Sequence, residues 1–171
     1  RILVKVHRPR RILEVGTAIG YSALVMASAS GGCARIDTIE IDEGMAGLAE
    51  KYLERSGFGS AIRVLRGDAY EVLQCLVTPY DMIFLDASKG QYPEFLPECL
   101  RLAREGGIIL SDNVLYRGLV ASSGHVEHKH RTIAVRLKEY LQSLCNNPLL
   151  DTAIIPIGDG LALSYKTRDK R

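Results

Sequence analysis

Two sets of polar residues in this 171-residue sequence have the types and spacing to do chemistry, and each follows a short apolar run. The first set is Glu14 with two glycines, Gly16 and Gly20, in RILEVGTAIGYS. Gly16 permits a tight turn, and Gly20 permits close approach of a ligand to the start of a helix. A dinucleotide site would use G-x-G-x-x-G and hold a pyrophosphate. Here one glycine is missing and a carboxylate precedes the turn, so the pattern favours a positively charged nucleoside over NAD.

Two further acids follow the next two apolar runs. Glu40 ends the run IDTIE, 20 residues after Gly20, where a carboxylate can accept hydrogen bonds from ribose hydroxyls. Asp68 and Ala69, in RGDAYEVL, come where an adenine edge would lie. Glycine turns and strand-end acids are each common alone. The three together, in this order, favour S-adenosylmethionine, which carries a sulfonium, an amino group and a ribose.

The second set follows two later runs. Asp86 comes directly after MIFL, Lys89 is three residues beyond it, and the adjacent pair Asp112 and Asn113 follows GIILS. Two carboxylates and an amide oxygen are hard ligands that suit Mg²⁺, Mn²⁺ or Ca²⁺. Helix capping is the simpler explanation for Asp86 alone. The Asp-Asn pair and the nearby lysine favour a metal site.

Alternating strand and helix patterns position both sets. We expect helices and a mostly parallel, doubly wound α/β sheet of seven strands, with an antiparallel C-terminal strand pair around IPIGDG. Asp159, between two glycines, is expected to form a turn. The chain is expected to be one domain, 1–171, that lacks an N-terminal helical segment. The expected strands are 11–15, 35–41, 62–66, 81–86, 107–112, 152–156 and 161–165, and the expected helices are 21–29, 43–56, 69–76, 92–103 and 130–145.

The motifs ILEVGTAIGYSALVMA, TIEID, RGDAYEVL, FLDASKGQY and LSDNVLYRG together resemble the metal-dependent S-adenosylmethionine O-methyltransferases. That family includes catechol and caffeoyl-CoA O-methyltransferases. The resemblance covers about Arg11 to Tyr165. DASKGQYPEF and PIGDGLALS are most similar to a bacterial branch that contains tRNA 5-hydroxyuridine methyltransferases. The resemblance implies a homodimer, and it implies that an N-terminal segment helps to cover the site. Ser88 departs from plant-type members, which often carry an acid there.

The resemblance also implies a role for each candidate residue. It assigns the methionine end and the glycine turn of the cofactor site to Glu14, Gly16, Thr17, Gly20 and Ser22. It assigns the ribose to Glu40 and the adenine side to Asp68 and Ala69, with Asp86 at the cofactor as well. Asp86, Asp112 and Asn113 become ligands of Mg²⁺ or a similar cation, and Asp86 and Lys89 become the catalytic pair, with Lys89 as the base.

Composition and charge exclude few classes of binding partner. The net charge of +2 does not by itself imply nucleic acid. A basic segment within HVEHKHRTIAVRLKEY is more often a solvated helix face, although it could face RNA. The four separated cysteines predict buried, reduced thiols in a cytoplasmic protein, and no apolar run is long enough to cross a membrane. Tyr92 and Tyr116 could stack on an aromatic acceptor, although packing tyrosines are more common.

These observations predict a metal-assisted O-methyltransferase that acts on an ionisable hydroxyl beside a second oxygen. The branch resemblance favours 5-hydroxyuridine in tRNA as the substrate. The alternative is a small catechol-type phenol or a caffeoyl-CoA-like compound. A non-catalytic cofactor-binding subunit is the rival from a different class, and the retained Lys89 and metal-ligand candidates argue against it.

Overall fold

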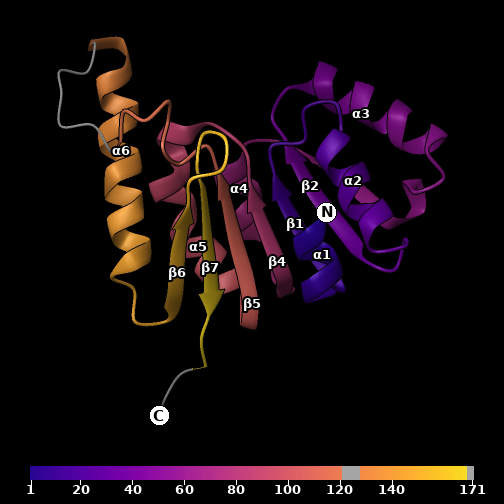
Figure 1. The fold of residues 1–171 in the computed structure, drawn as a ribbon. Coiled ribbons are helices and arrows are strands. Elements are labelled where there is room, and N and C mark those ends of the chain that lie inside the picture. Colours follow the sequence, from indigo (N-terminus) through magenta and orange to yellow (C-terminus); the bar gives the residue numbers. More distant parts are fainter. Residues whose placement is uncertain (121–127, 169–171) are drawn as a thin grey trace.

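A single mixed β-sheet organises the chain. The structure, a computed structural model, describes residues 1–120 and 128–168, with the side chains of 128–130 outside that description. The strands lie in the order β3-β2-β1-β4-β5-β7-β6 (Figure 1). Strands β1 to β5 pair in parallel, and β7 inserts antiparallel between β5 and β6. The predicted doubly wound sheet and its antiparallel end are therefore confirmed.

The elements alternate along the chain as the sequence pattern predicts. The strands are β1 (Arg11–Val15), β2 (Arg35–Glu40), β3 (Ile62–Arg66), β4 (Tyr80–Leu85), β5 (Ala103–Asp112), β6 (Leu150–Ile155) and β7 (Leu161–Lys166). The helices are α1 (Ile2–His7), α2 (Tyr21–Ala29), α3 (Glu43–Arg55), α4 (Ala69–Cys75), α5 (Tyr92–Leu102) and α6 (His128–Cys145), and two short 3₁₀ turns are η1 (Gly59–Ala61) and η2 (Lys89–Gln91).

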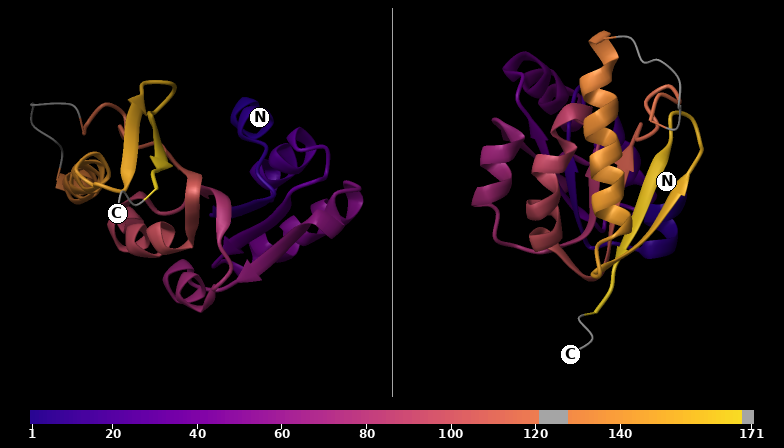
Figure 2. Two further views of the ribbon diagram at one scale, coloured as in Figure 1. Left: turned by 90° about the horizontal axis from the view of Figure 1, so that it is seen from below. Right: turned by 90° about the vertical axis from the view of Figure 1, so that its left-hand side faces the viewer.

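Helices cover both faces of the sheet (Figure 2). Successive residues of a strand point to opposite faces, and β1 shows this directly. Leu13 and Val15 pack in one hydrophobic core with residues of α4, α5 and α6. Ile12 packs in a second core with residues of α1, α2 and α3. The central strands are apolar on both sides because both of their faces are covered.

The structure differs from the sequence-based expectation in two elements. Helix α1 was not predicted, since six residues are too few for a clear helical period. Strand β5 begins at Ala103 rather than at Gly107, because Ala103 pairs with Tyr80 before an irregularity in the register. The other ends differ by two residues or fewer, as hydrogen-bonded ends commonly do.

The cysteines correct another expectation. All four are free, but Cys33, Cys75 and Cys145 are exposed and only Cys99 is buried. Burial raises the pKa of the Cys99 thiol to about 12, so this thiol stays protonated and packs as an apolar group. Separately, no helix among the described residues is both long and apolar enough to cross a membrane.

Candidate functional site

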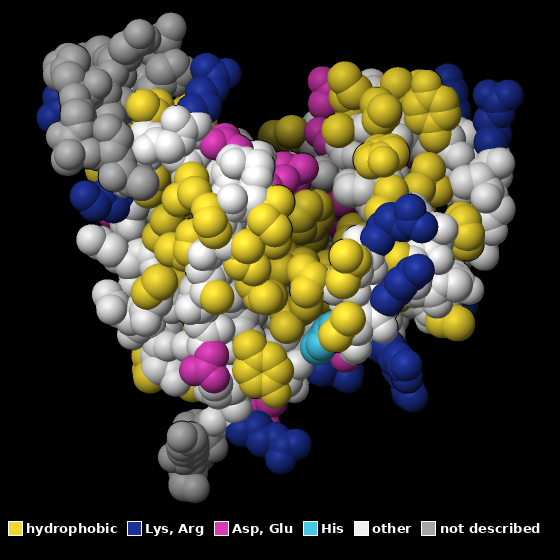
Figure 3. All heavy atoms as spheres, in the orientation of Figure 1, with side chains coloured by type: hydrophobic (Ala, Val, Ile, Leu, Met, Phe, Trp, Pro, Cys, Tyr) yellow, Lys and Arg dark blue, Asp and Glu magenta, His cyan; other side chains and the backbone are white. Residues whose placement is uncertain are grey.

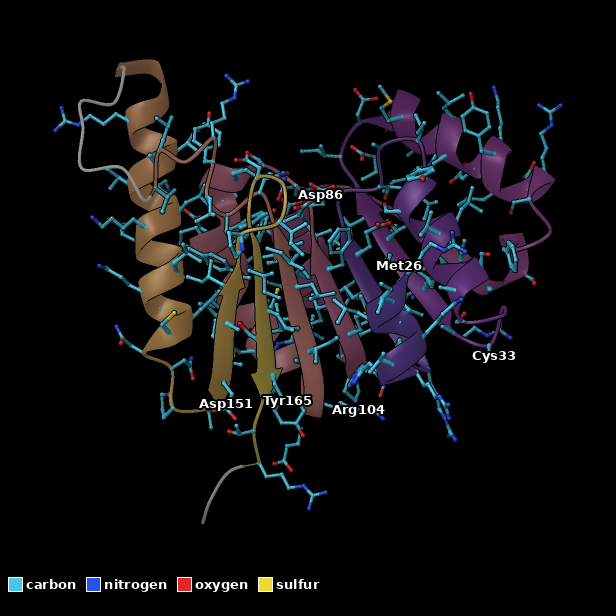
Figure 4. All side chains as sticks on the ribbon, viewed as in Figure 1. Met26, Cys33, Asp86, Arg104, Asp151 and Tyr165 are labelled. Atoms are coloured by element: carbon cyan, nitrogen blue, oxygen red, sulfur yellow. The ribbon has the colours of Figure 1, made fainter. Side chains whose placement is uncertain are left out.

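The carboxyl ends of β1, β2 and β4 form the rim of a cleft of about 220 Å³. The strand order reverses between β1 and β4, which is the switch point where open α/β sheets bind ligands. The two sets of sequence-predicted residues follow strands that end at this edge, where Asp86 is labelled in Figure 4. The cleft is lined by Val15, Gly16, Ala18, Ile39, Glu40, Ile41, Gly67, Asp68, Ala69, Asp86, Ala87, Ser88, Gln91 and Phe95.

The glycine turn after β1 is held against two neighbouring strands. The backbone N–H groups of Gly16 and Thr17 both donate to the carbonyl of Ile39, at 3.0 and 3.1 Å. Gly16 has φ +102°, and a Cβ atom there would lie 2.2 Å from the carbonyl oxygen of Asp86. Only glycine fits this position, because the chain after β4 passes directly beside it. Gly20, with φ +83°, then begins α2 as its N-cap.

Glu14 lies under this turn and is completely buried. Its Oε2 accepts a hydrogen bond of 2.6 Å from Thr38, whose hydroxyl also lies 2.7 Å from that of Thr17. Its Oε1 is buried and makes no hydrogen bond of normal geometry with the described residues, although the Ser22 hydroxyl lies close enough to lower the pKa of Glu14. Burial raises the pKa of Glu14 to about 7, helped by the nearby Asp86 and Glu40 and opposed by the hydroxyls of Ser22 and Thr38.

Glu40, at the end of β2, and Asp68, directly before α4, both line the cleft. The Glu40 carboxylate accepts from the N–H groups of Ala18, at 2.8 Å, and Asp42, at 3.0 Å, so it ties the glycine turn to the end of β2. Asp68 is the N-cap of α4 and accepts from the N–H of Tyr70 at 2.8 Å. Carboxylate oxygens have more than one lone pair, so both acids keep acceptor capacity for hydroxyl or amino groups.

These residues fit the nucleoside predicted from the sequence. An orphaned, buried carboxylate oxygen on Glu14 needs a positive group or a hydrogen-bond donor nearby. The cleft also presents the carboxylates of Glu40, Asp68 and Asp86, and none of the described residues that line it is an arginine or a lysine. A cationic adenosine derivative suits this arrangement better than a pyrophosphate. Thr17 is 1 % exposed and bonds to Thr38, so its side chain supports Glu14 rather than lining the cleft.

The second set lies next to the cleft, at the ends of β4 and β5. Leu85 and Ser111 are register partners, so Asp86 and Asp112, each one residue further, leave adjacent parallel strands at the same level. Lys89 donates to Asp86 Oδ1 at 2.7 Å, and the side chains of Lys89 and Asp86 are 17 % and 39 % exposed. The N–H of Asn113 donates to Asp112 Oδ1 at 2.7 Å. The fold therefore brings the two predicted acids together.

The donor set suits a hard cation, because carboxylate and amide oxygens are the groups that Mg²⁺ and Ca²⁺ prefer. Within the described ranges no group of three or more His, Cys, Asp and Glu side chains is placed to hold a metal. The candidate set has two acids and one amide, so it would need solvent or substrate oxygens to complete the coordination. The metal ligands remain a prediction.

Tyr92 has a role that sequence reasoning missed. Its side chain is completely buried, and its hydroxyl bonds to the carbonyl oxygens of Leu85, at 2.9 Å, and Asp112, at 3.1 Å. It therefore fixes the ends of β4 and β5 relative to each other, and the packing role that the sequence favoured over stacking on an acceptor ring is confirmed. Desolvation, with Asp86 and Asp112 nearby, raises its pKa far above the usual value, so the phenol stays neutral. The apolar residues near Tyr92 in the sequence of α5 were the feature that could have predicted that Tyr92 is buried.

The structure weakens the case for an RNA-binding surface on the basic segment. Arg136 forms an ion pair with Glu94 of α5. The side chains of His128, Lys129 and His130 lie outside the described residues.

Comparisons with known proteins identify the family. The sequence profile of the O-methyltransferase family matches residues 1–167. Catechol O-methyltransferase of Niastella koreensis is 37 % identical over 131 residues, covering 74 % of this chain and 59 % of that protein. Catechol O-methyltransferase of Mycobacterium tuberculosis is 34 % identical, covering 95 % of this chain and 74 % of that protein. The chain thus spans about three fifths to three quarters of the length of these relatives.

Solved structures agree with this assignment. The SAH-bound methyltransferase of Podospora anserina superposes with a TM-score of 0.88 at 28 % identity, covering 98 % of this chain and 76 % of that one. The O-methyltransferase TomG of Streptomyces achromogenes, involved in tomaymycin synthesis and solved in complex with SAM, gives a TM-score of 0.87 at 28 % identity, covering 98 % and 77 %. This chain therefore belongs to the family of S-adenosylmethionine-dependent O-methyltransferases.

Proposed function

We propose that this chain transfers a methyl group from S-adenosylmethionine to a hydroxyl of a small phenol that carries a neighbouring oxygen, as in a catechol. The observation that carries the proposal is the position of Asp86. It lines the cofactor cleft, bonds to Lys89, and lies at the level of Asp112 on the adjacent strand. A donor methyl and an acceptor hydroxyl held by these groups would meet at one edge of the sheet.

The named relatives support a small phenolic acceptor. Two are called catechol O-methyltransferases, and a Populus relative that is 29 % identical is called a caffeoyl-CoA O-methyltransferase. The sequence-based preference for 5-hydroxyuridine in tRNA has less support, since Arg136 of the basic segment is already paired with Glu94. We therefore prefer the phenol.

In the proposed reaction, residues of the chain hold the reactants and move one proton. Glu40, Asp68 and Asp86 line the cleft and bind the cofactor, and the glycine turn, with Glu14 buried beneath it, lets the cofactor approach the backbone. Asp86, Asp112 and Asn113 would hold Mg²⁺ or a similar cation, which would lower the pKa of the acceptor hydroxyl. Lys89 accepts the hydroxyl proton, and its contact with Asp86 keeps the amine beside the acceptor. The phenolate oxygen then displaces the sulfide from the methyl carbon.

The test is methyl transfer from labelled S-adenosylmethionine to catechol and to tRNA bearing 5-hydroxyuridine, each with Mg²⁺ or with EDTA. We expect label in catechol, lost with EDTA and far above that in tRNA. Label mainly in tRNA would replace the phenol with the nucleic acid. Equal label with EDTA would remove the metal from the proposal. Absence of label from both acceptors would contradict the proposed function.

We also propose a homodimer in the cytoplasm. Hydrophobic side chains gather over the sheet face that is toward the viewer in Figure 3, and Tyr165 of β7 lies on this face in Figure 4. Tyr165 is 46 % exposed and Ile2 of α1 is 77 % exposed. Extended apolar surface of this kind favours association, and the four free cysteines suit a reducing compartment. Light scattering after size exclusion would give twice the chain mass for a dimer and the chain mass alone if the proposal is wrong.

A further inference from the structure

The turn between β6 and β7 lies beside the chain segment that leaves β5. Both are at the upper edge of the sheet in Figure 1, the same edge at which Asp86 is labelled in Figure 4. The two segments are distant in the sequence, since their contacting residues Arg117 and Asp159 are 42 positions apart. We call residues 113–118 the β5 exit segment.

The β5 exit segment has an unfavourable backbone. Asn113, Tyr116 and Arg117 have φ values of 56°, 45° and 58°, and Gly118 continues at 77°. Left-handed conformation costs roughly 1–2 kcal/mol for a residue with a Cβ atom. Three such residues within five positions need contacts that hold them. Strained backbone of this kind persists where surrounding structure fixes it, commonly at functional sites.

The β6–β7 turn provides those contacts. The N–H of Val114 donates to the carbonyl of Gly160 at 3.0 Å, and the N–H of Leu115 donates to the carbonyl of Asp159 at 2.9 Å. The N–H of Arg117 donates to the Asp159 carboxylate. Three backbone donors of one short segment therefore end on two adjacent residues. The side chain of Asp159 thus accepts from Arg117, one of the three left-handed residues.

Packing makes the fit between the two segments tight. A Cβ atom on Gly160, which has φ +87°, would lie 2.4 Å from Cγ of Leu115. Gly158, in the same turn, also has a left-handed φ of +59°, but a Cβ atom there meets nothing within 4 Å. The two glycines therefore share backbone geometry, and only Gly160 touches the exit segment.

The exit segment begins with one candidate cation ligand, Asn113, and directly follows another, Asp112. Asn113 is itself one of the strained residues, and its N–H bonds to the carboxylate of Asp112. The carbonyl of Asp112 is fixed from the other side by the hydroxyl of Tyr92. A shift of the exit segment would therefore move the Asn113 amide relative to Asp86 and Asp112.

We propose that Asp159 is a positioning residue, which through the β6–β7 turn holds the β5 exit segment so that Asp112 and Asn113 present their oxygens to the cation. The proposal rests on the proposed function for the identity of that site. Asp159 should not affect the cofactor cleft, because neither Asp159 nor the exit segment lines the cleft. The cation and the acceptor should therefore lose affinity without a loss of cofactor binding.

The test measures Mn²⁺ affinity by electron paramagnetic resonance, S-adenosylhomocysteine affinity by calorimetry, and KM and kcat for catechol. Asp159→Ala should weaken Mn²⁺ binding and raise KM about ten-fold or more, because supporting groups around metal ligands usually act on this scale. Affinity for S-adenosylhomocysteine should stay within about two-fold of wild type. Asp159→Asn should recover most of the loss, since its amide oxygen can still accept from the N–H of Arg117.

Gly160→Ala and Gly158→Ala form the matched pair. Gly160→Ala should behave as Asp159→Ala does, and Gly158→Ala should match wild type in Mn²⁺ affinity. Equal Mn²⁺ affinity in the two glycine variants, or an equal loss of S-adenosylhomocysteine and Mn²⁺ binding in Asp159→Ala, would overturn the proposal. If wild type binds Mn²⁺ but methylates no phenol, the proposed function fails and the Mn²⁺ comparison still decides this inference. If wild type binds no Mn²⁺, the inference fails too.

Discussion

The two halves of the site, at the ends of β1 and β2 and at the ends of β4 and β5, are built in different ways. In the first half Glu14 is completely buried, and its supporting hydroxyl comes from Thr38 of the adjacent strand β2. In the second half Asp86 is 39 % exposed, and the supports come from Tyr92 and from Asp159. The cofactor half is therefore buried and built from contacts between adjacent strands, whereas the acceptor half is more exposed and depends on helix and loop residues that pack against the strand ends.

The largest effect should come from Gly16→Ala, which breaks the cofactor half. The new Cβ atom would lie 2.2 Å from the Asp86 carbonyl oxygen in a left-handed conformation. We expect unfolding to become easier by at least ~3 kcal/mol and S-adenosylhomocysteine binding to be lost. Urea denaturation and calorimetry measure both. Gly31→Ala, with φ +65° and no atom within 4 Å, is the control for strain alone. Similar losses in the two variants would mean that the close approach is unimportant.

Lys89→Met should break the acceptor half alone. Removal of a general base usually costs about 100- to 10,000-fold in rate. We expect kcat for catechol to fall within that range, while affinity for S-adenosylhomocysteine stays unchanged. Lys51→Met, on the exposed side of α3, is the matched control. Retention of more than half of the wild-type kcat would exclude Lys89 as the base.

Glu14→Gln should change stability in a pH-dependent way. The pKa of Glu14 is raised from 4.5 to about 7 in the folded chain, so the unfolded chain ionises first as pH rises. Stability from this group is fully present below pH 4.5 and is lost as pH rises through 7. The variant should therefore gain up to ~3 kcal/mol over wild type at pH 8 and little at pH 4.5. Urea denaturation at both values, with exposed Glu105→Gln as the control, tests this, and a gain independent of pH would contradict it.

Tyr92→Phe should have the smallest effect, because it removes one hydroxyl. We expect a loss of about 1–2 kcal/mol in the free energy of unfolding and a raised KM for catechol. Tyr140→Phe is the matched comparison, since Tyr140 is equally buried, packs edge-to-face on Tyr92 and bonds to Ser111. Tyr140→Phe should lose a similar free energy of unfolding, and its KM for catechol should be unchanged. Equal KM values in the two variants would show that Tyr92 does not position the acceptor half.

The difference between the cofactor half and the acceptor half also explains which features the sequence could predict. Strand β1, the glycine turn and the acid at the end of β2 are encoded locally, so period, glycine spacing and charge were enough to find them. Asp86 and Asp112 were found because parallel strands end at one edge of a sheet. The Asp159 contact and the Tyr92 bridge were not found as functional contacts, because each depends on how distant segments pack. Helix α1 and the exposure of Cys33 were missed for lack of a clear local pattern.

The most direct test of this account compares Asp112→Ala with wild type in two assays. One is calorimetric titration with S-adenosylhomocysteine, and the other is methyl transfer to catechol with Mg²⁺. If the two halves are independent, the variant binds S-adenosylhomocysteine within about two-fold of wild type and loses at least ~100-fold in methyl transfer. Loss of S-adenosylhomocysteine binding together with activity, or retention of activity, would contradict the division of the site into a cofactor half and a metal-assisted acceptor half.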